Sequence, residues 1–278
     1  MTTPGTTHAA GPPAPLRRVA ATRYVTPLRE GGSLPGLVEA DDDGLYVVKF
    51  RGAGQGVKAL VAEVVAGELA RALGLPVPEL VVVDLDPDLA RAEPDQEVQE
   101  LVTASAGGTN LGMDYLPGSV TFSPVADGTP ARAPAGELAA DVVWFDALVT
   151  NVDRSPSNPN LLVWHRRLHL IDHGAALYVH HSWRDPAGHA RKPFPLVGQH
   201  VLLPFAGSLA DADARLAPRV TADLLAAVLA LVPSDWLAGD ATYPEPEAHR
   251  QAYADYLLTR LAAPRVFADA AEEVRRGR

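Results

Sequence analysis

Short apolar segments separated by turn residues make up the first part of the chain. One strand is expected from Ala20, a second around residues 37–39 and a third over residues 45–50, with turn-forming residues at 29–33 and 41–44 between them. Strands joined by such short turns pair with their neighbours in sequence. The pattern therefore predicts a three-stranded antiparallel meander.

A helical pattern follows this meander. Apolar residues recur every three to four positions from Leu60 to Leu73, and Gly74 and Pro76 then supply the usual stop signals. Residues 79–85 form a continuous apolar run, which predicts a buried strand.

Further along the chain, helices outnumber strands. The spacing predicts helices over residues 137–149, 220–232 and 246–261, and a hairpin whose strands are 161–164 and 168–171. Residues 183–204 hold four prolines and are expected to be irregular. The fold class predicted is α+β, with a small lobe of antiparallel strands and a mostly helical second lobe.

Composition suggests where these lobes begin and end. Residues 1–19 are expected to be a flexible tail, because the Pro-, Gly- and Thr-rich start of the chain cannot bury enough apolar area to offset its ordering entropy. The small lobe is placed at 20–112 and the hinge with the larger lobe at 113–278. Residues 86–100 are acidic and polar and are expected to be a surface excursion, and the Pro/Gly-rich stretch up to Gly136 a loop or linker.

Composition and charge narrow the functional classes. The 278 residues carry 24 Lys+Arg against 34 Asp+Glu, so the formal charge is 24 − 34 = −10, and no basic cluster favours nucleic-acid binding. The absence of Cys excludes thiol nucleophiles and Cys-ligated metals and is typical of a reducing compartment. No apolar run approaches the ~20 residues of a membrane-spanning helix, so a cytoplasmic protein without a membrane partner is expected.

Four polar residues stand where phosphoryl transfer would need them. Asp153 and Asn158 lie in a turn-rich loop after a helix, Asp172 follows the second hairpin strand, and Lys49 ends an apolar strand. Such a reaction uses one carboxylate to orient the attacking hydroxyl, an amide and a second carboxylate to hold Mg²⁺, and a lysine near the phosphates. Turn formation would explain Asp153 or Asn158 singly, and edge protection would explain Lys49, but neither explains the set. Arg154 is expected to be a local ion-pair partner.

The histidines allow a different hypothesis. His165, His169, His173, His180 and His181 fall close together, and imidazole is a common zinc or iron ligand. Residues 165–167 are expected to turn the chain, which would place the rings on different faces. We therefore interpret them as scattered surface or supporting histidines.

Longer motifs give these residues a family context. The segment ELARALGLPVPEL at 68–80 and the combination TNVDRSPSNPNLL and LIDHGAAL at 150–177 resemble the HipA-like serine/threonine kinases, distant relatives of protein and phosphoinositide kinases. The resemblance covers about residues 20–235. It implies a bilobal protein-kinase-like fold that uses ATP and Mg²⁺.

The resemblance also implies roles in the small lobe and hinge. Lys49 would bind the ATP phosphates and pair with Glu63, although Glu68 is an equally valid acid by composition. The Gly-rich turn would cover the phosphates, and the hinge would offer backbone groups to adenine. The residues implied are Gly31, Gly32 and Ser33 in the turn, and Met113, Asp114, Tyr115 and Leu116 in the hinge.

In the second lobe the resemblance implies a catalytic and a metal-binding loop. Asp153 would be the catalytic aspartate and Asp172 would hold Mg²⁺. Asn158, five residues after Asp153, would be the second metal ligand, with Asn160 as a competitor directly before the strand LLVW. Two departures are clear: the Gly-rich turn has no regular GxGxxG, and Ser155 stands where the family usually has His.

The function implied is transfer of the γ-phosphoryl group of ATP to a hydroxyl of a protein Ser/Thr or a small molecule. Ser33 is a hypothetical site of autophosphorylation, and an antitoxin-like protein is a candidate regulator. Two alternatives stay open. One is a catalytically weak nucleotide-binding pseudokinase that acts as an interaction module, and the other is a metal-dependent hydrolase built from Asp153, Asp172 and His173.

Overall fold

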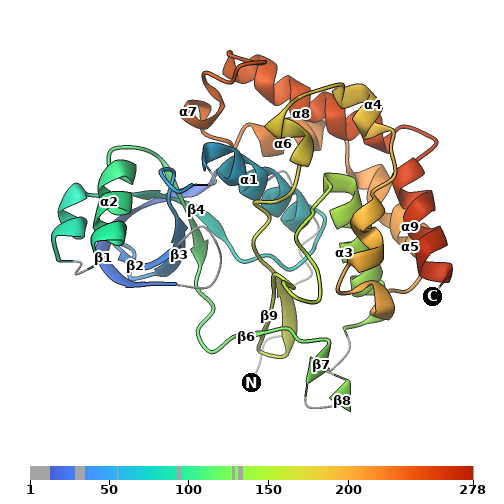
Figure 1. The fold of residues 1–278 in the computed structure, drawn as a ribbon, viewed down its shortest axis with the longest axis horizontal. Helices are drawn as coiled ribbons and strands as arrows, with labels where there is room; N and C mark the ends of the chain where they lie inside the picture. Colours follow the sequence, from blue (N-terminus) through green and yellow to red (C-terminus); the bar gives the residue numbers. More distant parts are fainter. Residues whose placement is uncertain are drawn as a thin grey trace.

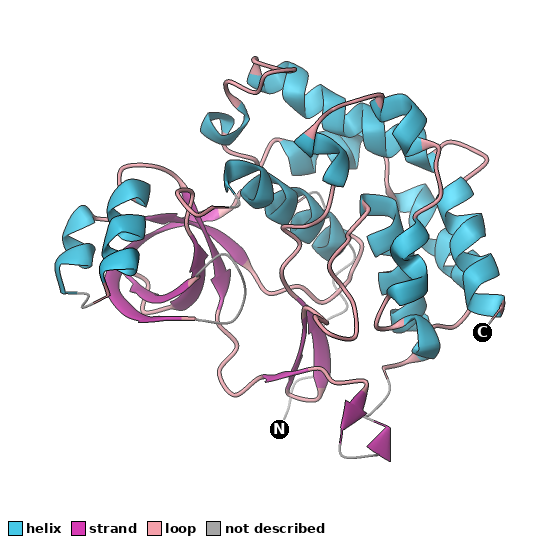
Figure 2. Cartoon of the chain, in the orientation of Figure 1, coloured by secondary structure: helices cyan, strands magenta, loops and turns pink. Residues whose placement is uncertain are grey.

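The chain folds into a small β-barrel beside a larger helical body (Figure 1). The computed structural model describes residues 13–28, 35–54, 56–92, 95–126, 129–130 and 134–277. This is the predicted α+β arrangement, with most strands gathered in the barrel and most helices in the larger body (Figure 2).

Five strands close the barrel in the order β1-β2-β3-β5-β4. The predicted meander of the first three is confirmed, because β2 is antiparallel to both β1 and β3. The strands are β1 (Arg17–Pro27), β2 (Gly36–Ala40), β3 (Leu45–Lys49), β4 (Leu80–Asp84) and β5 (Asn110–Asp114).

Barrel closure corrects the predicted limit of the tail. Strand β1 begins at Arg17, so residues 17–19, expected in the tail, belong to the barrel. They pair in parallel with β4 from Val81 onward, and Val19 is buried in the barrel core. The burial of Val19 and the pairing with β4 fix this part of the chain. The sequence gives no sign of it, because the residues around Val19 are polar.

One glycine allows the barrel to close tightly. A Cβ on Gly112 in β5 would lie 2.6 Å from Val83 Cγ2 and 2.9 Å from Val81 Cγ2. Gly112 pairs with Val48 on one side and Val81 on the other, so a larger residue here would push β4 and β5 apart.

The acidic stretch after β4 is more ordered than predicted. It contains the 3₁₀ helix η1 (Pro87–Ala92) and helix α2 (Gln96–Ser105), which begins at the N-cap Asp95. Most described side chains of 86–100 are exposed, as predicted, but Val98 and the following Val102 are buried in the barrel core. Val98, Leu101 and Val102 anchor this helix on the barrel core, and three apolar residues form too short a pattern to stand out among acidic ones.

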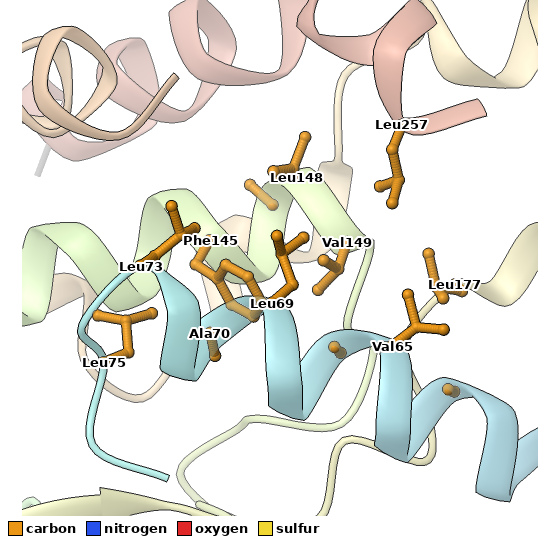
Figure 3. Packing of buried hydrophobic residues seen from close by; sticks show 14 of the residues in the cluster. Val65, Leu69, Ala70, Leu73, Leu75, Phe145, Leu148, Val149, Leu177 and Leu257 are labelled. Atoms are coloured by element: carbon orange, nitrogen blue, oxygen red, sulfur yellow. The ribbon is translucent and has the colours of Figure 1, made fainter. Parts of the chain in front are cut away.

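Helix α1 (Gly56–Ala72) joins β3 to β4 but packs in the helical body. Its residues Leu69 and Leu73 lie beside Phe145 of helix α3 (Gly136–Val149), as Figure 3 shows. Of the 17 residues of α1, 13 are buried. Most of them belong to the hydrophobic core of the helical body.

A second, smaller sheet lies next to α3. The predicted hairpin is confirmed as β9 (Leu161–Trp164) and β10 (Arg167–Leu170), and β6 (Val120–Thr121) adds to β9. Two further short strands, β7 (Val125–Ala126) and β8 (Thr129–Pro130), pair in the segment predicted as a linker.

The remaining helices surround α1 and α3. Predicted helices are confirmed at α6 (Ala222–Leu229) and α8 (Pro246–Leu261), the first shorter than expected. The region predicted as irregular, 183–204, holds several short helical turns instead. The other helical elements are η2 (Tyr178–His181), α4 (Pro186–Ala190), η3 (Pro195–Gln199), η4 (Leu203–Phe205), α5 (Leu209–Leu216), η5 (Ala217–Arg219), α7 (Ser234–Leu237) and α9 (Val266–Arg276).

Candidate functional site

Lys49 is the point at which the barrel meets the helical body. It ends β3, which pairs with β2 and β5, so it does not lie on an edge strand. Its Nζ lies 2.6 Å from Glu63 Oε2 in α1 and 2.7 Å from Asp172 Oδ1, a residue 123 positions away along the chain. The predicted convergence of Lys49 and Asp172 is therefore present, with Glu63 as a third member.

These three side chains differ in their exposure. Glu63 is 2% exposed and Lys49 is 15% exposed, whereas Asp172 keeps 42% of its side chain accessible. The acid that pairs with Lys49 is Glu63, while Glu68 lies 3.4 Å from Arg71 on the same helix. Asp172 is the member of the trio that remains open to a ligand.

Charge pairing outweighs burial in this trio. Burial alone would lower the pKa of Lys49, but the carboxylates of Glu63 and Asp172 raise it above its ordinary value. Burial alone would likewise raise the pKa of Glu63, but Lys49 and the neighbouring His173 hold it well below its ordinary range. Both groups are therefore charged at neutral pH.

The loop that carries Asp153 begins where α3 ends. Thr150 takes a left-handed conformation with φ of 53°, and the amide of Asn151 donates to the Asp146 carbonyl at 2.9 Å. Asp153 then accepts hydrogen bonds from two amides. Asn158 Nδ2 donates to Asp153 Oδ2 at 2.8 Å, and Asn160 Nδ2 donates to the Asp153 backbone carbonyl at 2.6 Å.

Asp172 lies beside this loop because of the hairpin. The Ile171 amide donates to the Asn160 carbonyl at 3.1 Å, which continues the β9–β10 pairing to the residue before Asp172. Asp172 itself has a φ of 53° and leaves the line of the strand there. Asn158 is exposed and forms a tight turn with Ser155. Asn160, in contrast, pairs through its backbone carbonyl with Ile171, the residue before Asp172.

Close packing brings α1 to the same place. A Cβ on Gly67 of α1 would lie 3.0 Å from Leu80 Cδ1 and 3.9 Å from His173 Nδ1. His173 is buried, with its Nδ1 3.8 Å from Glu63 Oε1. The residue after Asp172 is thus part of the contact with α1.

Two predicted regions contribute less to the observed geometry. Gly31, Gly32 and Ser33 lie outside the described residues. In the predicted hinge, Met113 and Asp114 belong to β5, and the amides of Asp114 and Tyr115 donate to the carbonyls of Glu79 and Leu45. Those two N–H groups are engaged in the barrel, and the Leu116 carbonyl accepts from the Ser119 amide at 3.1 Å.

One buried carboxylate beside the loop of Asp153 gives no signal in the sequence. Asp146 of α3 is fully buried and lies 2.5 Å from Arg154 Nε and 2.9 Å from His200 Nε2. Arg154 is an ion-pair partner as predicted. Asp146 escaped notice because it occupies one position in an otherwise apolar helix, and its partner lies in a distant, Pro-rich segment.

The described residues do not support a histidine-based metal centre. No group of three or more His, Asp or Glu side chains in the described ranges is arranged to hold a metal ion. His165 and His181 are exposed, whereas His173 and His180 are buried. His173 faces Glu63, with 3.8 Å between Nδ1 and Oε1.

The apolar segments also fit the packing of a globular protein. Across the described ranges, no helix combines the length and apolarity required to cross a bilayer.

Comparison with known proteins gives the context of this geometry. The model of a family described as HipA-like kinase matches residues 22–267. No curated protein matches the chain. The crystal structure of the Helicobacter pylori proinflammatory kinase CtkA has a TM-score of 0.57 at 14% sequence identity, covering 95% of this chain and 99% of that chain. This likeness shows a shared fold.

Two structures titled as the Golgi casein kinase are less similar. The first has a TM-score of 0.45 at 15% identity and covers 91% of this chain and 76% of that chain. The second, with Mn/ADP bound, has a TM-score of 0.45 at 14% identity and covers 91% and 74%.

Proposed function

The chain belongs to the HipA-like kinase family, and on that premise we propose that it transfers the γ-phosphoryl group of ATP to a hydroxyl, with Mg²⁺ as cofactor. The observation that carries this proposal is the contact of one lysine with two carboxylates from separate segments. Lys49 Nζ contacts Glu63 from α1 and Asp172 from the loop after β10.

Lys49 supplies positive charge for the phosphates of ATP. Its Nζ stays protonated because both neighbours are carboxylates, and Glu63 holds it in place from a position that ligand binding need not disturb. An ammonium fixed in this way can donate to phosphate oxygens without first reorganising, which is the main source of stabilisation in phosphoryl transfer.

The oxygen donors next to Lys49 fit Mg²⁺. Asp172 offers a carboxylate that is 42% exposed, and the two asparagines offer amide oxygens, the hard ligands that this ion prefers. Asn160 is the better candidate for the second ligand, because its backbone pairs beside Asp172 and its Nδ2 already points to Asp153. When bound, Mg²⁺ would neutralise charge on the phosphate oxygens.

Asp153 would act on the acceptor. Its Oδ2 accepts from Asn158, which orients the carboxylate. In the proposed reaction the acceptor oxygen forms a bond to the γ-phosphorus, the bond from that phosphorus to the β–γ bridging oxygen breaks, and ADP leaves. The hydroxyl proton passes to Asp153. The backbone between Met113 and Leu116 would contact adenine.

The acceptor we propose is a Ser or Thr hydroxyl of a protein, as the family implies. Ser33, Gly31 and Gly32 would form the turn over the phosphates, and an antitoxin-like protein remains a candidate regulator. A cytoplasmic location is part of the same proposal.

Phosphate transfer by the purified full chain tests the proposal. With γ-labelled ATP and Mg²⁺, the wild-type protein should label itself or proteins of a cell lysate, and Asp153→Asn or Asp172→Asn should each lower the rate at least ~100-fold. Asp211→Asn, an exposed carboxylate on α5, should have no effect. Asn160→Ala should raise the Mg²⁺ requirement more than Asn158→Ala does.

Other results would reject this function. If calorimetry detects ATP binding but no phosphate is transferred or released, the chain is a nucleotide-binding pseudokinase. Equal labelling by wild type and both aspartate variants would mean that the site has been assigned wrongly.

A further inference from the structure

A buried carboxylate organises the loop that carries Asp153. Asp146 has no exposed surface, and three side-chain donors reach it: Arg154 Nε at 2.5 Å, His200 Nε2 at 2.9 Å and Asn151 Nδ2 at 3.1 Å. A buried carboxylate is tolerated only where charge and hydrogen bonds compensate its desolvation. Here the charge comes from Arg154, the residue directly after Asp153.

Arg154 connects this carboxylate to the rest of the candidate site. Its guanidinium is buried, and NH1 donates to the backbone carbonyl of Asn160 and, at 3.4 Å, to that of Ile171. Asn160 is a proposed metal ligand, and Ile171 precedes the other one, Asp172. The forked guanidinium of Arg154 therefore connects Asp146 of α3 with the backbone at Asn160 and at Ile171, next to the two proposed metal ligands.

The other two donors extend the network to either side. Asn151 Oδ1 accepts from the Asp153 amide at 3.2 Å, so Asp146 is connected to the backbone of the catalytic loop as well. The Leu202 amide donates to His200 Nδ1 at 3.0 Å, which leaves the ring proton on Nε2 for Asp146. The Arg154 carbonyl accepts from the Val201 amide at 3.0 Å, which braces the loop against residues 200–202.

We propose that Arg154, with Asp146 as its buried counter-ion, is a positioning residue that fixes the loop of Asp153 and Asn160 relative to Asp172. The proposal rests on the proposed function for its catalytic meaning, but the geometry it predicts can be measured without activity. Replacement of the forked guanidinium by a single ammonium keeps the charge next to Asp146 and removes the simultaneous contacts with the two carbonyls.

Amide hydrogen exchange of the full chain carrying Arg154→Lys is the primary test. We expect exchange in residues 151–162 and 170–176 to become at least ~10-fold faster than in wild type, with helix α8 unchanged, because local opening costs less free energy there. Arg215→Lys is the matched control, since Arg215 pairs with Asp141 at the surface of the same helix α3 and touches neither loop. It should leave these segments protected as in wild type.

Kinetics give a second readout. In Arg154→Lys the rate of transfer at saturating ATP should fall at least ~10-fold and the Mg²⁺ requirement should rise, with a smaller change in the KM for ATP, because Lys49 is untouched. If Arg154→Lys does not fold, His200 serves instead. His200→Gln retains a donor for Asp146 and should preserve most of the rate and protection, whereas His200→Leu should lose both.

The outcomes separate this proposal from the proposed function. Unchanged exchange in the two loop segments, or equal acceleration throughout the molecule, would overturn the positioning role. A wild-type protein without phosphate transfer would end the proposed function, and the exchange result would still decide whether Arg154 positions the loops.

Discussion

The barrel and the helical body have separate hydrophobic cores. The barrel core is formed mainly by strand residues such as Val38, Val48 and Val83, with Val98 and Val102 from α2. The core of the helical body includes most of α1, although α1 lies between two barrel strands in the sequence. In the sequence α1 thus lies within the barrel region, whereas in the fold it packs with the helical body.

This difference determines how the candidate site is built. Lys49 belongs to the barrel, whereas Glu63, Asp153 and Asp172 all come from elements packed in the helical body. Glu63 is consequently positioned by the packing of α1 in the helical body.

Removal of packing between α1 and α3 should have the largest effect on stability. Leu69 is fully buried between α1 and α3 (Figure 3), so Leu69→Ala should lower the free energy of unfolding by about 2–5 kcal/mol through lost burial and a cavity. Urea unfolding measures this change. Hydrogen exchange should show α1 and α3 losing protection together, with less change in the barrel.

A matched leucine provides the control. Leu196→Ala, at a position 36% exposed, should change the free energy of unfolding by less than about 0.5 kcal/mol. If α1 lost protection together with the barrel strands instead of α3, the assignment of α1 to the helical body would be wrong.

Acidification should destabilise the helical body more than the barrel, by a smaller free energy than Leu69→Ala does. Residues 13–114 contain no His, while the helical body buries several. Burial lowers the pKa of His180 to about 3, and burial also lowers the pKa of His200 and His249. The unfolded chain, with a His pKa near 6.5, therefore takes up protons first as the pH falls, and stability is lost below that value.

For His180 alone, the free energy of unfolding should fall by about 2 kcal/mol between pH 7 and pH 5. The decrease comes from the roughly 1.5 pH units below 6.5, at about 1.36 kcal/mol for each unit. Urea unfolding at the two pH values should show this decrease in wild type and a smaller one in His180→Gln. His165→Gln, at an exposed position in the hairpin turn, should retain the wild-type slope. A wild-type protein equally stable at both pH values would contradict the account.

The sequence was most informative where one local pattern decided the structure. The helix at 137–149 and the hairpin around residues 165–167 were predicted from apolar periodicity and turn residues, and the structure has them as α3 and β9–β10. Lys49 and Asp172 were predicted to meet because a family motif places both. These features depend on neighbours in the sequence or on short motifs.

Features that depend on distant partners could not be predicted in this way. The parallel pairing of β1 with β4 closes the barrel through residues more than sixty positions apart. Asp146 gives no local signal, because its partners Arg154 and His200 become evident only once α3, the loop of Asp153 and the segment around residue 200 are packed together. The sequence could not decide between Glu63 and Glu68 either, because the side of α1 that faces Lys49 is fixed only when the helix packs.

The most direct test of the central claim is a double-mutant cycle between the barrel and the helical body. Lys49→Met, Glu63→Gln and the double variant are compared by urea unfolding, with a second cycle that pairs Lys49→Met with Glu68→Gln. We expect an interaction energy above about 1 kcal/mol for Lys49 with Glu63, and additivity within about 0.5 kcal/mol for Lys49 with Glu68. Additive effects of Lys49 and Glu63 would contradict it.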